Sequence, residues 1–306
     1  MTSDIKASWI AADWGTTNLR VWALDQTAEI IAHRCSDRGM GKLTPEEFEP
    51  ALLELIDDLL DDHTKTSVII CGMAGSRQGW AEAPYKTTPC TPPDLQDATQ
   101  ISAKDRRLIV HILPGIKQLS PPDVMRGEET QIAGFLAKRP GFTGTLCLPG
   151  THTKWVALTN GRIDRFRTCM SGETFALFSE YSVLRHGLSD KVLDRSAFTA
   201  AVGEVAANPE ILASELFGIR AAGLVSGLSP EAARGRLSGL LIGAEVAAVS
   251  KEFELQNSVL LGSDKIAGVY ADALTTLGYN TDLSDADAIT LQGLSLAYNS
   301  TSKVPS

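Results

Sequence analysis

Two short turns rich in glycine and threonine contain the residues of this sequence best suited to chemistry. Residues 13–17 read Asp-Trp-Gly-Thr-Thr and residues 149–154 read Pro-Gly-Thr-His-Thr-Lys, each after a short apolar segment. A glycine lets the backbone approach a phosphate closely, and successive N–H groups and threonine hydroxyls then donate to its oxygens. Each turn, named here the first turn and the second turn, is a candidate phosphate-binding turn. For each, an ordinary β-hairpin is the alternative.

The charged side chains of the two turns add to this chemistry. Asp13 stands at a strand end, where a carboxylate can hold Mg²⁺ directly or through its waters, or can cap its own turn. Lys154 adds a cation to the second turn, unless it is exposed. His152 by itself is more typical of a structural residue than of a catalyst.

The elements around the two turns follow one plan. Residues 9–12 and 19–24 read as strands on either side of the first turn, and residues 145–148 and 154–158 do the same around the second. The pair Asn160-Gly161 is a strong hairpin signal before a further strand. The plan recurs about 135 residues along the chain, which suggests two halves of similar design. A cleft with one phosphate turn on each wall is what phosphoryl transfer needs.

Helix signals complete this α/β pattern. Thr44, Pro45 and Glu47 form a capping box with proline in the first turn of a helix. Further helices are expected near residues 127–138 and 265–277 and at the end of the chain, and the second half is mostly helical.

Composition limits the class of protein. The chain has 306 residues, a net charge of −9, 43% hydrophobic residues and 21% charged residues, as in an ordinary globular protein. The negative charge argues against a nucleic-acid partner, which needs clustered Lys and Arg. No apolar run approaches a membrane span and no secretory signal is seen, so we expect a cytoplasmic protein. A homodimer is compatible with the sequence, which does not determine the oligomeric state.

Familiar phosphate and hydrolase motifs are missing. The sequence contains no G-x-x-x-x-G-K-[ST], no G-x-G-x-x-G after a strand, no H-E-x-x-H and no G-x-S-x-G. The two turns therefore remain the leading candidates.

Together the turns resemble a known superfamily. Residues 13–20 (DWGTTNLR) resemble the first phosphate motif of the sugar kinase/Hsp70/actin superfamily, close to the hexokinase form, and residues 148–155 (LPGTHTKW) resemble its second phosphate loop. Residues 259–263 (VLLGS) and the following helix are similar to its adenosine-site strand and turn.

Three further segments narrow the resemblance to the 2-dehydro-3-deoxygalactonokinase family. These are residues 125–131 (MRGEETQ), residues 240–246 (LLIGAEV), and residues 72–76 (GMAGS) with Gly79-Trp80. The resemblance spans about residues 9 to 296, and it implies an α/β chain of two ribonuclease H-like domains, the actin-like ATPase fold, with an interdomain active-site cleft. We expect one domain over 1–140, completed by the helix 285–298, and the other over 141–284.

The resemblance also implies the reaction, in which ATP phosphorylates 2-dehydro-3-deoxy-D-galactonate to its 6-phosphate in galactonate catabolism. The enzyme would be a carbohydrate kinase with Mg²⁺ as cofactor. The alternatives are a kinase for 2-dehydro-3-deoxygluconate, a hexose or another acceptor, and a nucleotide-binding sensor without fast turnover.

Site residues follow from the same resemblance. The implied phosphate-binding residues, besides Asp13 for Mg²⁺, are Gly15, Thr16, Thr17, Gly150, Thr151 and Lys154. The adenosine site would involve Gly243, Gly262 and Ser263.

The catalytic base would be a carboxylate at the start of the helix near Gly127. Glu128 is preferred over Glu129, with Asp123 third, although the superfamily usually has Asp. A helix N-terminus also attracts carboxylates for dipole reasons alone, so a structural role stays open.

The substrate carboxylate needs a donor, for which a bidentate arginine is well suited. Arg126, beside the expected base, is the first candidate. Arg77, in a loop that also contains Ser76, is the second, and we include Ser76 in the expected substrate site.

Overall fold

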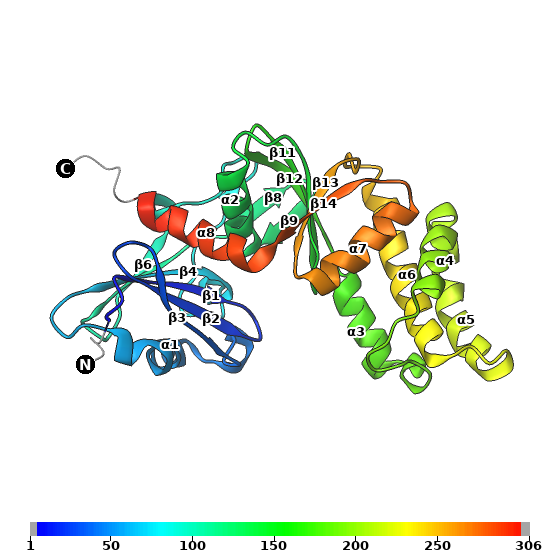
Figure 1. Cartoon of the computed structure of the whole chain (residues 1–306), viewed down its shortest axis with the longest axis horizontal. Coiled ribbons are helices and arrows are strands. Elements are labelled where there is room, and N and C mark those ends of the chain that lie inside the picture. Colours follow the sequence, from blue (N-terminus) through cyan, green and yellow to red (C-terminus); the bar gives the residue numbers. More distant parts are fainter. Residues whose placement is uncertain (1–4, 301–306) are drawn as a thin grey trace. The chain divides into compact units, whose positions relative to one another are not determined.

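The computed structural model describes residues 5–300, which form two compact units (Figure 1). The first unit contains the chain up to Phe142, residues 159–164 and the chain from Ala286 onward, and the second contains residues 143–158 and 165–285. The sequence places the first domain boundary after residue 140, whereas the first unit extends to Phe142. It did not include the return of residues 159–164 to the first unit.

A six-stranded sheet forms the centre of the first unit, in the order β3-β2-β1-β4-β7-β6. β1 pairs antiparallel with β2 and parallel with β4, and β4 continues parallel with β7. The strands are β1 (Trp9–Trp14), β2 (Leu19–Leu24), β3 (Ile30–Ser36), β4 (Thr66–Gly72), β6 (Thr99–Ile101) and β7 (Leu108–Ile112).

Helices cover both faces of this sheet. Because side chains alternate along a strand, Ile10 and Ala12 of β1 pack with α1 (Phe48–Ile56), whereas Trp9 and Ala11 face the other way. That other face is covered by α8 (Ala286–Asn299), through Leu294 and Ala297, as Figure 1 shows for the red helix beside the blue strands. The last helix in the chain therefore completes the first unit.

The first helix begins as the sequence predicts. Thr44 and Glu47 form a reciprocal capping box, and Pro45 opens a 3-10 turn over Pro45–Glu47 that leads into α1.

A small three-stranded sheet was not expected. It consists of β5 (Lys86–Thr87), β8 (Ile116–Leu119) and β9 (Pro122–Met125), in the order β5-β8-β9. The sequence showed only a loop and a proline break here, because two-residue and four-residue strands are too short for a periodic signal. β9 leads directly into α2 (Glu128–Lys138), whose start near Gly127 is confirmed.

The second unit repeats the core topology of the first. Its sheet has the order β12-β11-β10-β13-β14, again with an antiparallel meander beside two parallel strands. The strands are β10 (Gly144–Leu148), β11 (Thr153–Thr159), β12 (Arg162–Cys169), β13 (Ser258–Gly262) and β14 (Thr281–Asp285). The hairpin at Asn160-Gly161 is confirmed, with φ of 49° and 75°. The expectation of two ribonuclease H-like domains is confirmed.

Five helices pack in the second unit: α3 (Ser171–Tyr181), α4 (Arg195–Ala207), α5 (Leu212–Val225), α6 (Pro230–Val249) and α7 (Asp264–Thr276). α6 and α7 bury Val246 and Tyr270 with Trp155 of the sheet. No helix in the described part of the chain is both long and apolar enough to cross a membrane.

In the first unit, the backbones of α2 and α8 are in direct contact. A Cβ atom added at Gly134 would lie 2.0 Å from the carbonyl oxygen of Ile289, and one added at Gly293 would lie 2.0 Å from that of Thr130. The two helices therefore cross at positions where only glycine fits.

We expect Gly134→Ala to destabilise the protein. The methyl group meets backbone atoms that cannot rotate away. The free energy of unfolding should therefore fall by at least the roughly 1–3 kcal/mol that overpacking usually costs. Thermal unfolding followed by circular dichroism would measure the loss.

Gly203→Ala in α4 is the matched control. Nothing lies within 4 Å of its added Cβ. Alanine should therefore stabilise this helix by roughly 0.5–1 kcal/mol. Equal melting temperatures for the two variants would contradict the glycine crossing.

Candidate functional site

The first turn lies at the carboxyl end of β1 and is held by a neighbouring loop. The N–H groups of Gly39, Met40 and Gly41 donate to the carbonyl oxygens of residues 17, 15 and 16, at 3.1, 3.0 and 2.9 Å. The side chains of Thr16 and Thr17 are exposed. The loop fixes the turn through its carbonyl groups, and the two hydroxyls face solvent.

Asp13, the first residue of this turn, is half-buried and paired. Arg20 of β2 donates to its Oδ2 at 2.6 Å, and the thiol of Cys71 lies 3.7 Å from its Oδ1. Gly72 beside it has φ +88°, and a Cβ there would lie 2.6 Å from the carbonyl oxygen of Trp14 and 3.4 Å from Oδ1. The glycine keeps the surroundings of Oδ1 open.

The start of α2 lies against the same strand ends. A Cβ on Gly127, which has φ +110°, would be 3.5 Å from the Cα of Gly72. Burial raises the pKa of the Cys71 thiol, and the carboxyl groups of Asp13 and Glu129 raise it further. The structure therefore gathers Asp13 and the expected base segment in one place in the first unit.

The two glutamates at this helix start differ in environment. Glu129 is fully buried, and both of its carboxyl oxygens accept from the N–H of Gly127 at 2.8 Å. Burial, and next the charge of Glu128, raise the pKa of Glu129 to about 8. Glu128 is only half-buried, and its Oε2 accepts from the N–H of Arg126 at 3.0 Å. Glu129 is thus a buried helix cap, and Glu128 is the one with access to solvent.

Arg126 is held flat against an aromatic ring. Its guanidinium carbon lies 4.2 Å from the centre of the Tyr85 ring, and its Nη2 donates to the carbonyl oxygen of Ala83 at 2.9 Å. Its Nε and Nη1 are buried and have no hydrogen-bond partner among the described residues, and the same holds for the hydroxyl of Ser76. A Cβ on Gly75 would lie 2.7 Å from Nη1. Residues of the segment 75–85 thus lie around the Arg126 guanidinium, whose Nε and Nη1 can donate hydrogen bonds to a ligand.

The other two candidates in the first unit lie in different settings. The Arg77 side chain is 80% exposed, with its Nε 3.8 Å from Glu82. Asp123 is in β9, where its Oδ1 accepts from the N–H of Val124 at 2.8 Å. Arg77 is therefore largely solvated, and Asp123 belongs to the small sheet.

The second turn belongs to the second unit. Nothing lies within 4 Å of a Cβ added at Gly150, and the side chains of Thr151 and His152 are exposed. The His152 ring nitrogen Nε2 lies 2.5 Å from Glu173 of α3. A Cβ on Gly172 would lie 2.3 Å from the carbonyl oxygen of Gly150, so the start of α3 packs directly on this turn.

A cavity of about 680 Å³ opens beside the second turn, within the second unit. Its lining includes three of the predicted residues, Gly150, Thr151 and Ser263. Apolar side chains and several charges complete it: Phe175, Leu193, Leu241, Ile242, Ile266, Val269, Tyr270, Asp190, Lys191, Arg195, Arg234 and Lys265. An apolar pocket with a cationic rim suits a ligand with a flat apolar end and an anionic end.

Three other predicted residues do not line this cavity. Lys154 is only 5% exposed, with its Nζ 3.5 Å from the carbonyl oxygen of His152. Gly243 faces α4, where an added Cβ would lie 2.6 Å from Val205. A Cβ added at Gly262 would lie 3.5 Å from the Cδ of Pro149. Gly243 therefore allows close packing of α6 against α4, whereas the surroundings of Gly262 would accommodate a Cβ.

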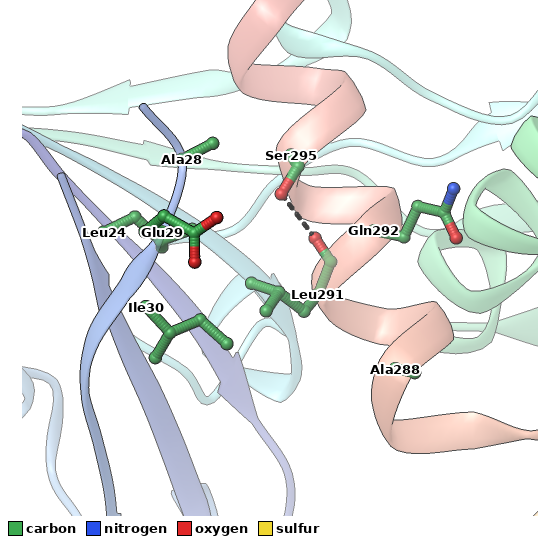
Figure 2. A pocket seen from close by; sticks show the side chains of 8 residues that line it. All are labelled: Leu24, Ala28, Glu29, Ile30, Ala288, Leu291, Gln292 and Ser295. Carbon is green, nitrogen blue, oxygen red and sulfur yellow. Dashed lines mark hydrogen bonds between the residues drawn. The ribbon is translucent and has the colours of Figure 1, made fainter. Parts of the chain in front are cut away.

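A smaller hollow of about 350 Å³ lies between α8 and the β2–β3 turn (Figure 2). Leu291, Gln292 and Ser295 line it from α8, and the Ser295 hydroxyl donates to the carbonyl oxygen of Leu291. None of the predicted site residues lines it.

The sequence missed several lining residues. Tyr85 lies in a stretch that showed only loop signals, and Arg234, Phe175 and Lys191 come from separate segments of the second unit. No local motif marks these four, because only the fold brings them to the sites.

Comparisons with known proteins show which family the chain resembles. The family model described as 2-keto-3-deoxy-galactonokinase matches residues 13–297. The probable 2-dehydro-3-deoxygalactonokinase of Rhizobium meliloti (strain 1021) is 37% identical over 94% of this chain and 96% of its own length. The 2-dehydro-3-deoxygalactonokinase of Escherichia coli (strain K12) is 35% identical over 89% of this chain and 91% of its own length.

One solved structure supports the same assignment, and a second shows the fold alone. A crystal structure from Sinorhizobium meliloti, described under the same enzyme name, matches with a TM-score of 0.89 and 36% identity over 97% of this chain and 100% of its own. Component A of (R)-2-hydroxyglutaryl-CoA dehydratase from Acidaminococcus fermentans shares the fold, with a TM-score of 0.50 at 15% identity over 96% of this chain and 99% of its own. The chain belongs to the 2-keto-3-deoxy-galactonokinase family.

Proposed function

We propose that this chain transfers the terminal phosphate of ATP to the 6-hydroxyl of 2-dehydro-3-deoxy-D-galactonate. The names of the family and of its two curated relatives support this substrate. The observation that carries the proposal is the buried guanidinium of Arg126, whose Nε and Nη1 have no partner.

An anionic substrate explains that arrangement. A buried charged donor without a partner is costly, and a carboxylate compensates it with short, charge-assisted hydrogen bonds. Tyr85 stacks on the guanidinium and Ala83 holds one end, so its plane is fixed before the substrate arrives. The Ser76 hydroxyl is a further donor, next in sequence to Gly75, where an added Cβ would lie 2.7 Å from Nη1 of Arg126. A neutral hexose offers no carboxylate for this site, which favours the keto-deoxy acid over the hexose alternative.

Glu128 is the proposed catalytic base. The acceptor hydroxyl must lose a proton as it attacks phosphorus, and a carboxylate within hydrogen-bond reach can take that proton. Glu129 is unsuitable because it is fully buried, and its pKa, raised to about 8, favours the protonated form at neutral pH. Glu128 is half-buried and follows Arg126 by two residues, which places it close in the chain to the proposed carboxylate site.

Asp13 fits the role of a Mg²⁺ ligand. No group of three or more metal-binding side chains occurs among the described residues, so the ion would rely on one carboxylate, water and phosphate oxygens, which is usual for Mg²⁺. Gly72 leaves room beside Oδ1. Bound there, Mg²⁺ would neutralise charge on the phosphates of ATP. Arg20 orients the carboxylate through its Oδ2.

Each turn is assigned a phosphate-binding role within its own unit, and the nucleoside of ATP is assigned to the cavity of the second unit. The first turn offers the Thr16 and Thr17 hydroxyls, and the second offers Gly150 and Thr151 beside the cavity. Lys154 is buried, so we give it a supporting role in the turn in place of direct phosphate contact.

Arg126→Met should raise KM for the keto-deoxy acid at least about 100-fold, because the substrate carboxylate then loses its charged partner. ADP release, followed with a panel of sugar acids and neutral hexoses, measures it. Arg77→Met is the control and should change KM less than about twofold, since that side chain is 80% exposed. A wild-type preference for neutral hexoses would refute the substrate assignment.

Glu128→Gln should lower kcat by about 10²–10⁴-fold with little change in KM, because a general base is lost. Single-turnover phosphoryl transfer, measured by rapid quench, tests the chemical step directly.

Glu129→Gln is the matched control, since an amide oxygen can still accept from Gly127. It should keep most activity but change the pH dependence of stability. A carboxyl group whose pKa is higher in the folded than in the unfolded protein contributes stability that is fully present below the unfolded pKa. This contribution is lost as the pH rises toward 8. The free energy of unfolding of the wild type should fall relative to the variant by up to about 1.4 kcal/mol per pH unit between pH 5 and 8. A larger kcat loss in Glu129→Gln than in Glu128→Gln would reverse the assignment.

Asp13→Asn should abolish most activity while the protein stays folded, because an amide is a weaker Mg²⁺ ligand and no longer carries charge. The apparent affinity for Mg²⁺, obtained from activity titrations at fixed ATP, should weaken along with kcat. Unchanged turnover in this variant would exclude the metal role.

A further inference from the structure

The segment 240–246 on α6 contains a buried acid that the proposed reaction does not use. Glu245 is 5% exposed in the interior of the second unit. Its Oε1 accepts from the indole N–H of Trp155 at 2.7 Å, and its Oε2 accepts from the hydroxyl of Tyr270 at 3.1 Å. Burial raises the pKa of Glu245, and hydrogen bonds from Ser171, Trp155 and Tyr270 act in the opposite direction.

These contacts continue to the second turn. The Tyr270 hydroxyl lies 2.7 Å from the Thr153 hydroxyl, and the N–H of Gly150 lies 3.4 Å from that same Thr153 oxygen. Thr153 and Trp155 are two residues apart on β11, so their side chains lie on the same face of the strand. They point toward Tyr270 on α7 and Glu245 on α6. A continuous series of polar contacts therefore joins Glu245 to Gly150.

The carboxylate gives this series one direction. The Tyr270 hydroxyl donates to Glu245, so it accepts from Thr153, and the Thr153 oxygen is left to accept from the N–H of Gly150. With an amide at position 245, the amide N–H can donate to Tyr270, and the Tyr270 hydroxyl then accepts this hydrogen bond instead of donating one. Thr153 can then turn its proton toward the carbonyl oxygen of Gly150, which lies 3.5 Å away.

The same residues border the cavity. Tyr270 and Ser171, which both bond to Glu245, are among its lining residues together with Gly150. The acid behind the cavity wall is therefore linked to the wall and to the turn at its mouth.

We propose that Glu245, Tyr270 and Thr153 are positioning residues that hold the second turn in its phosphate-binding conformation. The proposal rests on the assignment of the cavity and this turn to ATP. A role in stability alone is the alternative, and the two differ in which part of the nucleotide loses affinity.

Adenosine and ADP separate these roles. Isothermal titration calorimetry of the full chain with each ligand should show Kd for ADP raised about tenfold or more in Tyr270→Phe, since one buried hydrogen bond is lost beside the turn. Kd for adenosine should stay within about threefold, because the ring still lines the cavity. Thr153→Val, which removes the same link from the other side, should give the same pattern.

Glu245→Gln and the double variant Glu245→Gln/Tyr270→Phe complete the test. If the residues act in series, the double variant should weaken ADP no more than the worse single variant. Tyr279→Phe removes a hydroxyl from a half-buried tyrosine elsewhere in the second unit and should leave both ligands unaffected.

Unchanged ADP affinity in both Tyr270→Phe and Thr153→Val would overturn the proposal, as would equal weakening of adenosine and ADP. Wild-type protein that binds neither ligand would instead remove the nucleotide site itself, and the proposal with it. The failure of the positioning role is thus distinguishable from the failure of the proposed function.

Discussion

The crossing of α2 and α8 is the contact on which the first unit depends. Gly134 and Gly293 let the two backbones touch, and this fixes α2 on a helix that already covers the sheet through Leu294 and Ala297. Since Glu128 and Glu129 open α2 and Arg126 precedes it, the orientation of that helix sets where all three lie. The distance between Gly127 and Gly72, beside Asp13, is a result of the same packing.

Burial gives two adjacent glutamates different tasks. Glu129 is enclosed and bonded to the helix start, so it serves the fold, and its pKa is raised to about 8. Glu128, one residue earlier, keeps access to solvent. The same reasoning separates Arg126 from Arg77, since a stacked and enclosed guanidinium can select an anion, whereas an exposed side chain is solvated already.

Local signals in the sequence were enough to predict part of this structure. The capping box at Thr44 and Glu47, the hairpin at Asn160-Gly161 and the start of α2 depend on neighbours in the chain, and all three are confirmed. The recurrence of one turn pattern indicated two similar units. In contrast, the burial of Lys154, the packing of Gly243 against α4 and the stacking of Tyr85 on Arg126 depend on residues far away in sequence. No periodicity or motif could have indicated them.

The chain order of the first unit has a consequence for its biosynthesis. Its sheet is made from the earliest residues, but the helix that covers Trp9, Ala11 and Ile69 begins only at Ala286. Domains generally fold as the chain leaves the ribosome, N-terminal parts first. Here one apolar face of the first sheet must wait until the entire second unit has been synthesised. During that interval the face lacks the helix that buries it, and it becomes covered only when α8 has been made.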